Sequence, residues 1–201
     1  MTAPDRLIQA AQEELVLGSG RLEMQAVAKR AQVSVGLAYH HFGSKAGLIA
    51  AVVEAFYSQL DVAAFEGFNM PSGAWADREQ ARILAYIQFH YSHPLAALMV
   101  GALSRSPEVQ DVEVAFTRKQ LAGGARMIAA AQTQGILSDH LDPALTIALM
   151  VGGIRQALHE ALTQDPRPNP QALADQIWAF MAAALGSSGA SAILSTSRST
   201  L

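Results

Sequence analysis

The most informative stretch of the chain is VAKRAQVSVGLAYHHFGSKAGLIAAV, residues 27–52. Around it, apolar residues recur at helical spacing over two short segments, 24–31 and 35–41. The tripeptide Gln32-Val33-Ser34 separates these segments and predicts a tight turn. The pattern therefore predicts a helix-turn-helix, an arrangement in which the second helix lies in the major groove of DNA.

Neighbouring segments complete a small helical domain around this pair. The sequence IQAAQEEL, residues 8–15, places its apolar residues on one helical face, and Gly18 and Gly20 end the segment. Downstream, Ser44 is a suitable N-cap for a longer helix from Lys45 to about Glu66. We therefore expect three short N-terminal helices and a fourth helix that connects them to the remainder of the chain.

Composition excludes several classes of protein. The chain has 201 residues, of which 51% are hydrophobic and 15% charged, so it can bury a core and is unlike a disordered chain. The absence of cysteine rules out a disulfide scaffold, a thiolate zinc site and a cysteine nucleophile. No apolar run approaches the roughly 20 uncharged residues of a membrane span, and the first residues lack the basic flank of a signal peptide. We expect a cytoplasmic protein with no membrane partner.

Charge is distributed unevenly along the chain. The formal net charge is −3, and residues 1–60 hold five Lys or Arg and five Asp or Glu, so the acidic excess lies entirely downstream. A neutral N-terminal third is less basic than a typical DNA-binding module. This balance taken alone argues weakly against a nucleic-acid partner.

The rest of the chain has helical periodicity and no strand-like alternation. The predicted helices run over about 76–92, 94–104, 107–134, 142–164 and 170–185. Residues 69–73 are the clearest internal break, and eight of the sixteen residues in 186–201 are Ser or Thr, which predicts a disordered tail. The predicted domains are a helix-turn-helix domain over 1–55 with helix 45–66 as connector, a second domain over 56–185, and the tail over 186–201.

Residues 27–52, preceded by 8–15, resemble the DNA-binding domain of the TetR family of repressors over roughly residues 5–55. The resemblance lies in the spacing Tyr39-x-His41-Phe42-x-x-Lys45-x-x-Leu48, with Ala28, Ala31, Val33 and Ser34 upstream. It implies an all-α chain, in which an N-terminal three-helix helix-turn-helix DNA-binding domain is followed by a helical ligand-binding and dimerisation domain. Downstream of the front domain the likeness is architectural.

The resemblance also implies roles in DNA binding. Residues at the start of the recognition helix touch base edges, Tyr39 and His40 bind phosphate, and Lys45 adds its ammonium to the N–H groups that begin the fourth helix. His41 contacts the DNA backbone or packs against the next helix. The implied DNA-binding residues are Gln25, Ser34, Val35, Gly36, Leu37, Tyr39, His40, His41 and Lys45.

Two positions depart from the family pattern. Met24 stands where many members have a Thr or Ser that caps the second helix and contacts phosphate, and Leu37 stands where a small or polar side chain is common. Because Val35 is apolar as well, readout by hydrogen bonds is poor. Contacts with thymine methyl groups, or recognition of DNA shape, are expected instead.

In the family, the last two long helices pair with their copies in a homodimer, and here these are helices 142–164 and 170–185. Two stripes are candidates for this contact: Leu145, Ala148, Leu149, Gly152 and Gln156 on the first helix, and Ile177, Phe180, Met181 and Ala184 on the second. The alternative is that these stripes form intramolecular core.

A binding cavity for an unknown small-molecule effector is expected among the helices from 76 to 164, which supply apolar, aromatic and a few polar side chains. At each single position, ordinary core packing or surface exposure is the alternative. The candidate ligand-binding residues are Tyr86, Phe89, His90, Met99, Leu103, Phe116, Met127, Met150, Ile154, Arg155, His159 and Trp178.

Signals for catalysis or metal binding are weak. The pair His90-x-x-His93 has a spacing that can bind a metal, but no carboxylate or cysteine lies nearby in the sequence. No phosphate-binding glycine loop, nucleophile elbow or HExxH motif is present. We therefore expect no catalytic residues, no metal and no cofactor.

These observations predict a ligand-responsive repressor of the TetR type, which binds a palindromic double-stranded DNA operator as a homodimer and is released by a small apolar or aromatic effector. The alternative is a small-molecule binding protein whose helix-turn-helix-like domain no longer binds specific DNA. An all-helical enzyme has the least support.

Overall fold

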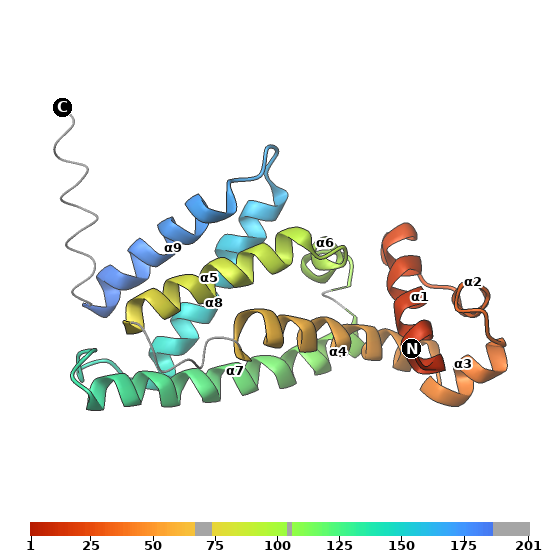
Figure 1. Cartoon of the computed structure of the whole chain (residues 1–201), viewed down its shortest axis with the longest axis horizontal. Coiled ribbons are helices and arrows are strands. Elements are labelled where there is room, and N and C mark those ends of the chain that lie inside the picture. Colours follow the sequence, from red (N-terminus) through yellow and green to blue (C-terminus); the bar gives the residue numbers. More distant parts are fainter. Residues whose placement is uncertain (67–73, 104–105, 187–201) are drawn as a thin grey trace. The chain divides into compact units, whose positions relative to one another are not determined.

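The computed structural model describes residues 1–66, 74–103 and 106–186, and the elements in these ranges are α-helices (Figure 1). They are α1 (Ala3–Leu17), α2 (Met24–Arg30), α3 (Val35–Phe42), α4 (Lys45–Ala64), α5 (Trp75–Ser92), α6 (Ala96–Val100), α7 (Pro107–Thr133), α8 (Pro143–Thr163) and α9 (Pro170–Leu185). The predicted all-α class is confirmed. The predicted break at 69–73 and the predicted tail beyond Gly186 lie outside the described residues.

The prediction of a helix over 94–104 was wrong in its length. α6 is five residues long and ends at Val100. The chain turns back after Gly101, where the N–H of Leu103 donates to the carbonyl of Leu98 at 2.9 Å. Ala102 and Leu103 therefore leave the helix axis, although their side chains alone permit a longer helix.

Contacts divide the chain into two compact units. The first consists of Met1–Val62 with Ser92–Phe116, and the second of Ala63–Tyr91 with Thr117–Leu201. The first unit thus contains α1 to α3, nearly all of α4, α6 and the start of α7. The second contains α5, most of α7, α8 and α9.

A small apolar core holds α1, α2 and α3 together. α1 begins with a capping box in which the side chains of Thr2 and Asp5 each accept a hydrogen bond from the other's backbone N–H. The buried apolar residues of these helices are Leu7, Ala10, Ala11, Leu15, Met24, Val27, Ala28 and Ala38. Because Ala28 and Ala38 carry small side chains, the short helices approach one another closely.

α4 is the long helix of the first unit, and aromatic contacts fix it to the segment that follows α5. The ring of Phe56 meets that of His93 edge-on at 4.8 Å between centroids, and Tyr57 stacks on Phe116 at 4.5 Å. By length and composition α4 would pass as a membrane span, with a mean hydropathy of 1.3. This is weak evidence for a span, because core helices meet the same test, and Phe56 is 1% exposed.

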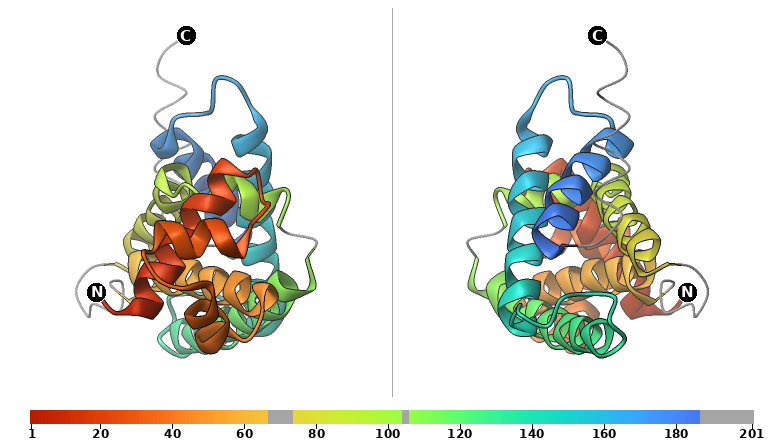
Figure 2. Two further views of the ribbon diagram at one scale, coloured as in Figure 1. Left: turned by 90° about the vertical axis from the view of Figure 1, so that its right-hand side faces the viewer. Right: turned by 90° about the vertical axis from the view of Figure 1, so that its left-hand side faces the viewer.

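The second unit has its own core, to which α5, α7, α8 and α9 all contribute. Trp75 at the start of α5 and Trp178 in α9 lie with their ring centroids 6.2 Å apart. α8 and α9 form an antiparallel hairpin and lie side by side (Figure 2). Asp142 and Asn169 cap their N-termini by accepting backbone N–H groups.

The two stripes that the sequence suggests for dimer contact differ in their exposure to solvent. All five residues of the α8 stripe are exposed, including Leu145 at 68% and Leu149 at 77%. Of the α9 stripe, Phe180 is 79% exposed and Ala184 is exposed, whereas Ile177 and Met181 are buried in the core of their own unit. The intramolecular alternative therefore holds for half of the α9 stripe.

Candidate DNA interface and ligand-binding region

The turn before α3 is closed by local hydrogen bonds. Gln32 adopts a left-handed conformation with φ 55°, and the N–H of Val33 donates to the carbonyl of Ala28 at 3.0 Å. Ser34 then caps α3, its Oγ accepting the N–H of Leu37 at 3.1 Å. The turn and the cap fix the start of α3 relative to α2.

The far end of α3 is held equally closely. The N–H of Gly43 donates to the carbonyl of Tyr39 at 2.8 Å, and Ser44 then caps α4 by accepting the N–H of Gly47 at 3.0 Å, which confirms the predicted N-cap. A Cβ atom at Gly47 would overlap the carbonyl oxygen of Phe42. The first turn of α4 therefore lies against the last turn of α3.

Most of the side chains predicted to bind DNA are exposed. Ala38 is fully buried, and Phe42 is half-buried. Gly36 and His40 point away from Ala38 by helical geometry, and Tyr39 is 46% exposed beside them. Val35 and Leu37 are half-buried, while the exposed members of the predicted set are Gln25, Ser34, Gly36, Tyr39, His40, His41 and Lys45.

The start of α2 reflects the departure at Met24. Met24 is buried, and the N-cap residue Glu23 makes no side-chain capping bond. Instead, Glu23 forms an ion pair with Lys45, 3.7 Å between Oε1 and Nζ. Both side chains are well exposed, so the contact is weak and salt-screened.

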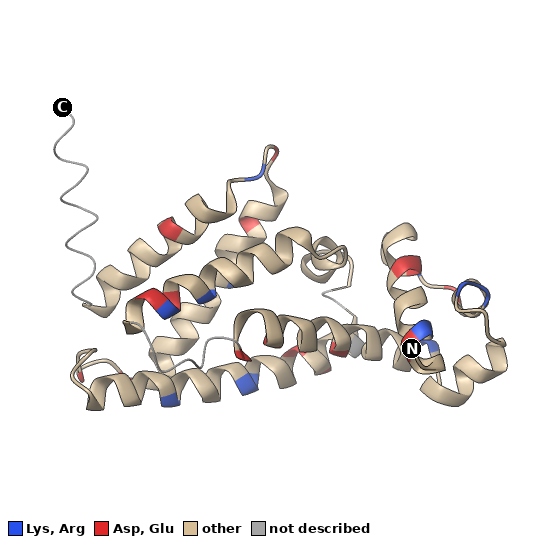
Figure 3. Ribbon diagram, viewed as in Figure 1, with Lys and Arg blue, Asp and Glu red and all other residues tan. Residues whose placement is uncertain are grey.

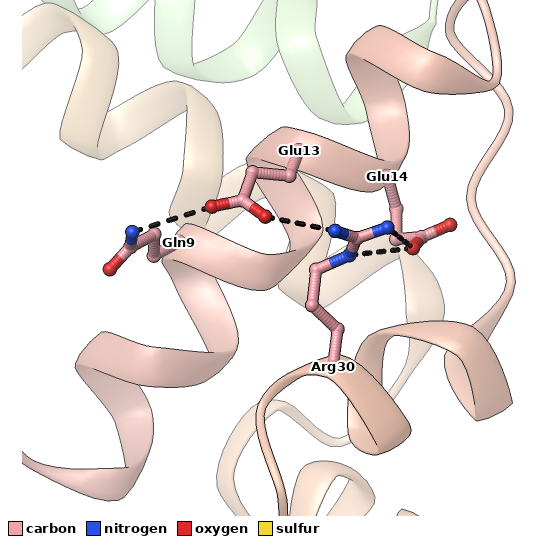
Figure 4. A network of polar contacts seen from close by, with 4 residues as sticks. All are labelled: Gln9, Glu13, Glu14 and Arg30. Carbon is pink, nitrogen blue, oxygen red and sulfur yellow. Dashed lines mark hydrogen bonds and ion pairs between the residues drawn. The ribbon is translucent and has the colours of Figure 1, made fainter.

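Charge at this candidate interface is sparse. α3 carries no Lys, Arg, Asp or Glu, as Figure 3 shows. Arg30 of α2 reaches back to Glu13 and Glu14 of α1 at 3.1 and 2.7 Å (Figure 4). Its charge is therefore occupied in holding α2 on α1.

Lys29 is a cationic residue that sequence reasoning did not single out. It is exposed, forms no ion pair among the described residues, and follows Gln25 by one helical turn on the same face of α2. The spacing of four residues between Gln25 and Lys29 is the feature of the sequence that could have pointed to Lys29.

In the second unit, four of the candidate ligand-binding residues lie together. The ring of Tyr86 lies 4.4 Å from that of His90, and Phe89 meets His90 edge-on at 5.5 Å. Burial raises the pKa of Tyr86 to about 12, and the nearby positive charge of Arg155 opposes this rise. Arg155 in turn donates to the hydroxyl of Thr117 at 3.2 Å.

The other candidates are dispersed. Met150 and Trp178 are buried in the core cluster of the second unit, and Met127 and Ile154 pack against that cluster. His159 is exposed on α8. The remaining three, Met99, Leu103 and Phe116, belong to the first unit.

A buried stripe along α5 combines two of the predicted candidates, Tyr86 and His90, with three residues that sequence reasoning missed, Trp75, Glu79 and Arg82. Trp75, Glu79, Arg82, Tyr86 and His90 follow one another at steps of four, three, four and four residues, so they share one helical face. Trp75 and Glu79 are each only 4% exposed, and His90 is 6% exposed. The step pattern was visible in the sequence, but charged residues at such positions are seldom buried.

His90 and His93, the pair whose spacing could bind a metal, each use one ring nitrogen in a hydrogen bond with the backbone. Nδ1 of His90 donates to the carbonyl of Tyr86 at 2.8 Å, and Nδ1 of His93 accepts the N–H of Leu95 at 3.2 Å. No group of three or more metal-binding side chains occurs within the described ranges.

Comparison with known proteins identifies the front domain. The family described as "Bacterial regulatory proteins, tetR family" matches residues 7–52, which include α2, α3 and most of α1. None of the curated proteins compared with the chain matches it.

Solved structures share the fold over nearly the whole chain. A protein from Rhodococcus sp. assigned to the TetR-family transcriptional regulators is 21% identical, with a TM-score of 0.71 over 91% of this chain and 98% of its own. FadR from Bacillus subtilis, solved in complex with stearoyl-CoA, is 17% identical, with a TM-score of 0.75 over 88% and 96%. SmeT, the repressor of the Stenotrophomonas maltophilia multidrug efflux pump SmeDEF, is 19% identical, with a TM-score of 0.73 over 90% and 89%.

The matched residues include α3, whose N-terminal cap and buried Ala38 are described above. The fold of the described residues is that of solved TetR-family regulators. Residues 7–52 therefore form a helix-turn-helix domain of the TetR family, and the described residues share the overall fold of solved proteins assigned to that family.

Proposed function

We propose that this protein is a ligand-responsive repressor, which binds a palindromic operator as a homodimer and is released by a small apolar or aromatic effector. The observation that carries the proposal is the construction of α3. Ser34 caps the helix, Ala38 anchors it on the core, and Tyr39 and His40 remain exposed next to Gly36. A helix that is capped, anchored on a core and exposed along its outer face suits insertion into a major groove.

Dimerisation follows from the size of the recognition element. One helix reads a few base pairs, so useful specificity needs two half-sites about 34–36 Å apart and a two-fold dimer. Leu145, Leu149 and Phe180 are large apolar side chains that are at least 68% exposed in a single chain. Their burial against a second copy of α8 and α9 would remove this apolar surface from water.

Response to an effector is proposed as a population shift between two arrangements of the dimer, of which one fits consecutive major grooves. The structures of related fold support such a role, since SmeT represses an efflux pump and FadR binds stearoyl-CoA. The Tyr86, His90 and Arg155 neighbourhood in the second unit offers aromatic and polar contacts. Action on DNA implies a cytoplasmic location.

DNA binding is tested by fluorescence anisotropy with duplexes from the region flanking the gene and with scrambled duplexes of equal length and composition. We expect a preference of at least about tenfold for one flanking duplex at fixed salt. Tyr39→Phe with Lys45→Ala should weaken binding to both duplexes, because phosphate contacts carry no sequence information. Val35→Ala with Leu37→Ala should reduce the preference itself.

Arg118→Ala serves as the matched control, because Arg118 is an exposed cation on α7 in the second unit. It should change neither the affinity nor the preference. Equal affinity of the unaltered protein for flanking and scrambled duplexes would contradict the repressor.

A small-molecule binding protein without specific DNA affinity remains the second proposal, and one observation favours it. Two of the basic side chains near α3 already form ion pairs within the chain. Arg30 pairs with Glu13 and Glu14, and Lys45 pairs with Glu23. This proposal predicts ligand binding with no preference among duplexes at any moderate salt concentration.

A further inference from the structure

Three polar atoms on the buried stripe of α5 lack hydrogen-bond partners among the described residues. They are Nε1 of Trp75, Oε1 of Glu79 and Nε of Arg82. Glu79 and Arg82 do meet through their other atoms, Oε2 and Nη1, at 3.0 Å. Nη1 of Arg82 also contacts the sulfur of Met127 at 3.2 Å. The ion pair is thus half-satisfied, which is costly in a buried site unless another group completes it.

The unpartnered nitrogen of Trp75 lies in apolar surroundings. Trp75 belongs to the core cluster of the second unit, with Ile83 of its own helix, Ile128 of α7 and Trp178 of α9. A partner that completes these atoms would place a polar head at Glu79 and Arg82 and pack an apolar body against the aromatic and aliphatic side chains around Trp75.

The charges around Glu79 determine whether the polar head is a cation or an anion. The charged groups that act on the Glu79 carboxyl are Arg82 and Arg78, two cations against one carboxylate. The nearby acids Asp77 and Asp175 are exposed, and Asp175 accepts hydrogen bonds from Gln80 at 3.0 Å and from another side chain of α9. A cationic head would be repelled by both guanidinium groups, whereas an anion would be attracted.

The hydrogen-bonding capacity of the three atoms agrees with an anion. Trp75 Nε1 and Arg82 Nε are donors. Burial raises the pKa of the Glu79 carboxyl above its ordinary value, with Arg82 and Arg78 opposing the rise, so an added negative charge nearby would favour its protonated form. A protonated Glu79 becomes a third donor.

We propose that Trp75, Glu79 and Arg82 form a binding site for the carboxylate of a small acid with an apolar body. Arg82 and Trp75 donate to the carboxylate, and Glu79 takes up a proton from solvent and donates as well. The role of this acid as effector rests on the proposed function, but binding itself does not.

The site has a built-in reporter. The chain has two tryptophans, Trp75 and Trp178, and both lie at the site. Three probes with the same eight-carbon chain differ in the head alone: octanoate, octanamide and octylammonium. We expect octanoate to change tryptophan emission saturably, with higher affinity at pH 6 than at pH 8, and we expect little response to octylammonium.

Two variants move the affinity for octanoate in opposite directions. Arg82→Gln should weaken it by at least about tenfold, because a charge-assisted hydrogen bond is lost. At pH 8, Glu79→Gln should bind octanoate more tightly than the unaltered protein, and its affinity should not depend on pH, because no proton has to be taken up. Arg118→Gln, an exposed change on α7, should leave the affinity unaltered. General destabilisation cannot produce this opposite pair of effects, and thermal melts of each variant check the fold.

Several results would overturn the site: emission that responds to octylammonium but not to octanoate, octanoate affinity that is insensitive to Arg82→Gln, or no response to any probe. DNA anisotropy with and without octanoate separates the two proposals. Octanoate binding without any effect on DNA affinity would retain the carboxylate site and reject its effector role. Failure of all DNA binding would reject the repressor while the emission titration still decides the site.

Discussion

Gly20 and Ala102 approach each other closely in the first unit. Gly20 lies in the loop between α1 and α2 with φ 92°, and a Cβ atom built on it would be 3.1 Å from the Cβ of Ala102 and 3.9 Å from Cδ2 of Leu103. Ala102 follows α6, so the end of α6 contacts the loop that leads into the helix-turn-helix. A movement of α6 would therefore press directly on that loop.

Enlarging Ala102 tests this contact. Ala102→Leu should push the loop away from α6 and weaken DNA binding by about five- to tenfold without ligand, the size of a coupling energy of about 1 kcal/mol. The melting temperature should change little, because Ala102 is exposed. Anisotropy titrations measure the affinity, and Ala97→Leu, an exposed position on α6, is the control. Equal DNA affinity for the two variants would show that the contact transmits nothing.

Helical periodicity is a local property, and for this reason the fold class and the helix-turn-helix were predictable from the sequence. The Gly20–Ala102 contact joins residues far apart in the chain and left no local signal. The burial of Glu79 is similar, since its charge suggests exposure and only the packing of the second unit places it inside. Apolar spacing likewise could not separate Phe180, which is exposed, from its buried neighbour Met181.

Two helical glycines of the front domain should respond differently to alanine. Gly47→Ala places a Cβ against the carbonyl oxygen of Phe42 and should destabilise the fold by about 1–3 kcal/mol. Gly36→Ala meets nothing closer than Oγ of Ser34 at 3.9 Å, so stability should be unchanged or slightly higher while DNA affinity falls. Urea unfolding and anisotropy distinguish the two. If Gly36→Ala left DNA binding intact, the exposed face of α3 would not be the contact surface.

Salt dependence should separate Lys45 from Arg30. If Lys45 contacts phosphate, Lys45→Ala should reduce the slope of log affinity against log salt by about 1 for each subunit. Arg30→Ala should leave the slope nearly unchanged, because Arg30 is engaged with Glu13 and Glu14 (Figure 4). Titrations between 50 and 200 mM salt, about a fourfold range, measure both slopes. A slope that fell in Arg30→Ala and not in Lys45→Ala would show that Arg30, and not Lys45, contacts phosphate.

A charge on the exposed apolar face of α8 and α9 should prevent dimerisation. Leu149→Glu or Phe180→Glu would place a carboxylate in an interface, whereas in the isolated chain these side chains are 77% and 79% exposed. We expect sedimentation to show monomers with unchanged helix content. Glu160→Gln, an exposed change on the same helix α8, is the control. Dimers that persist in both glutamate variants would exclude this face as the interface.

Acid should weaken the first unit through His93. Its Nδ1 accepts the N–H of Leu95, so the ring is unprotonated at this atom, and burial against surroundings that include Phe56 lowers its pKa below the ordinary 6.5. The unfolded chain thus binds the proton more readily than the folded chain. Stability that His93 provides is complete above about pH 6.5 and is lost as the pH falls through the lower, folded-state pKa. We expect the stability difference between the unaltered protein and His93→Gln to shrink from pH 7.5 to pH 5, as measured by thermal unfolding. Gln134→Ala, at an exposed position without an ionisable side chain, should show a constant difference over the same range. A difference that stayed constant for His93→Gln as well would mean that His93 does not couple folding to protonation.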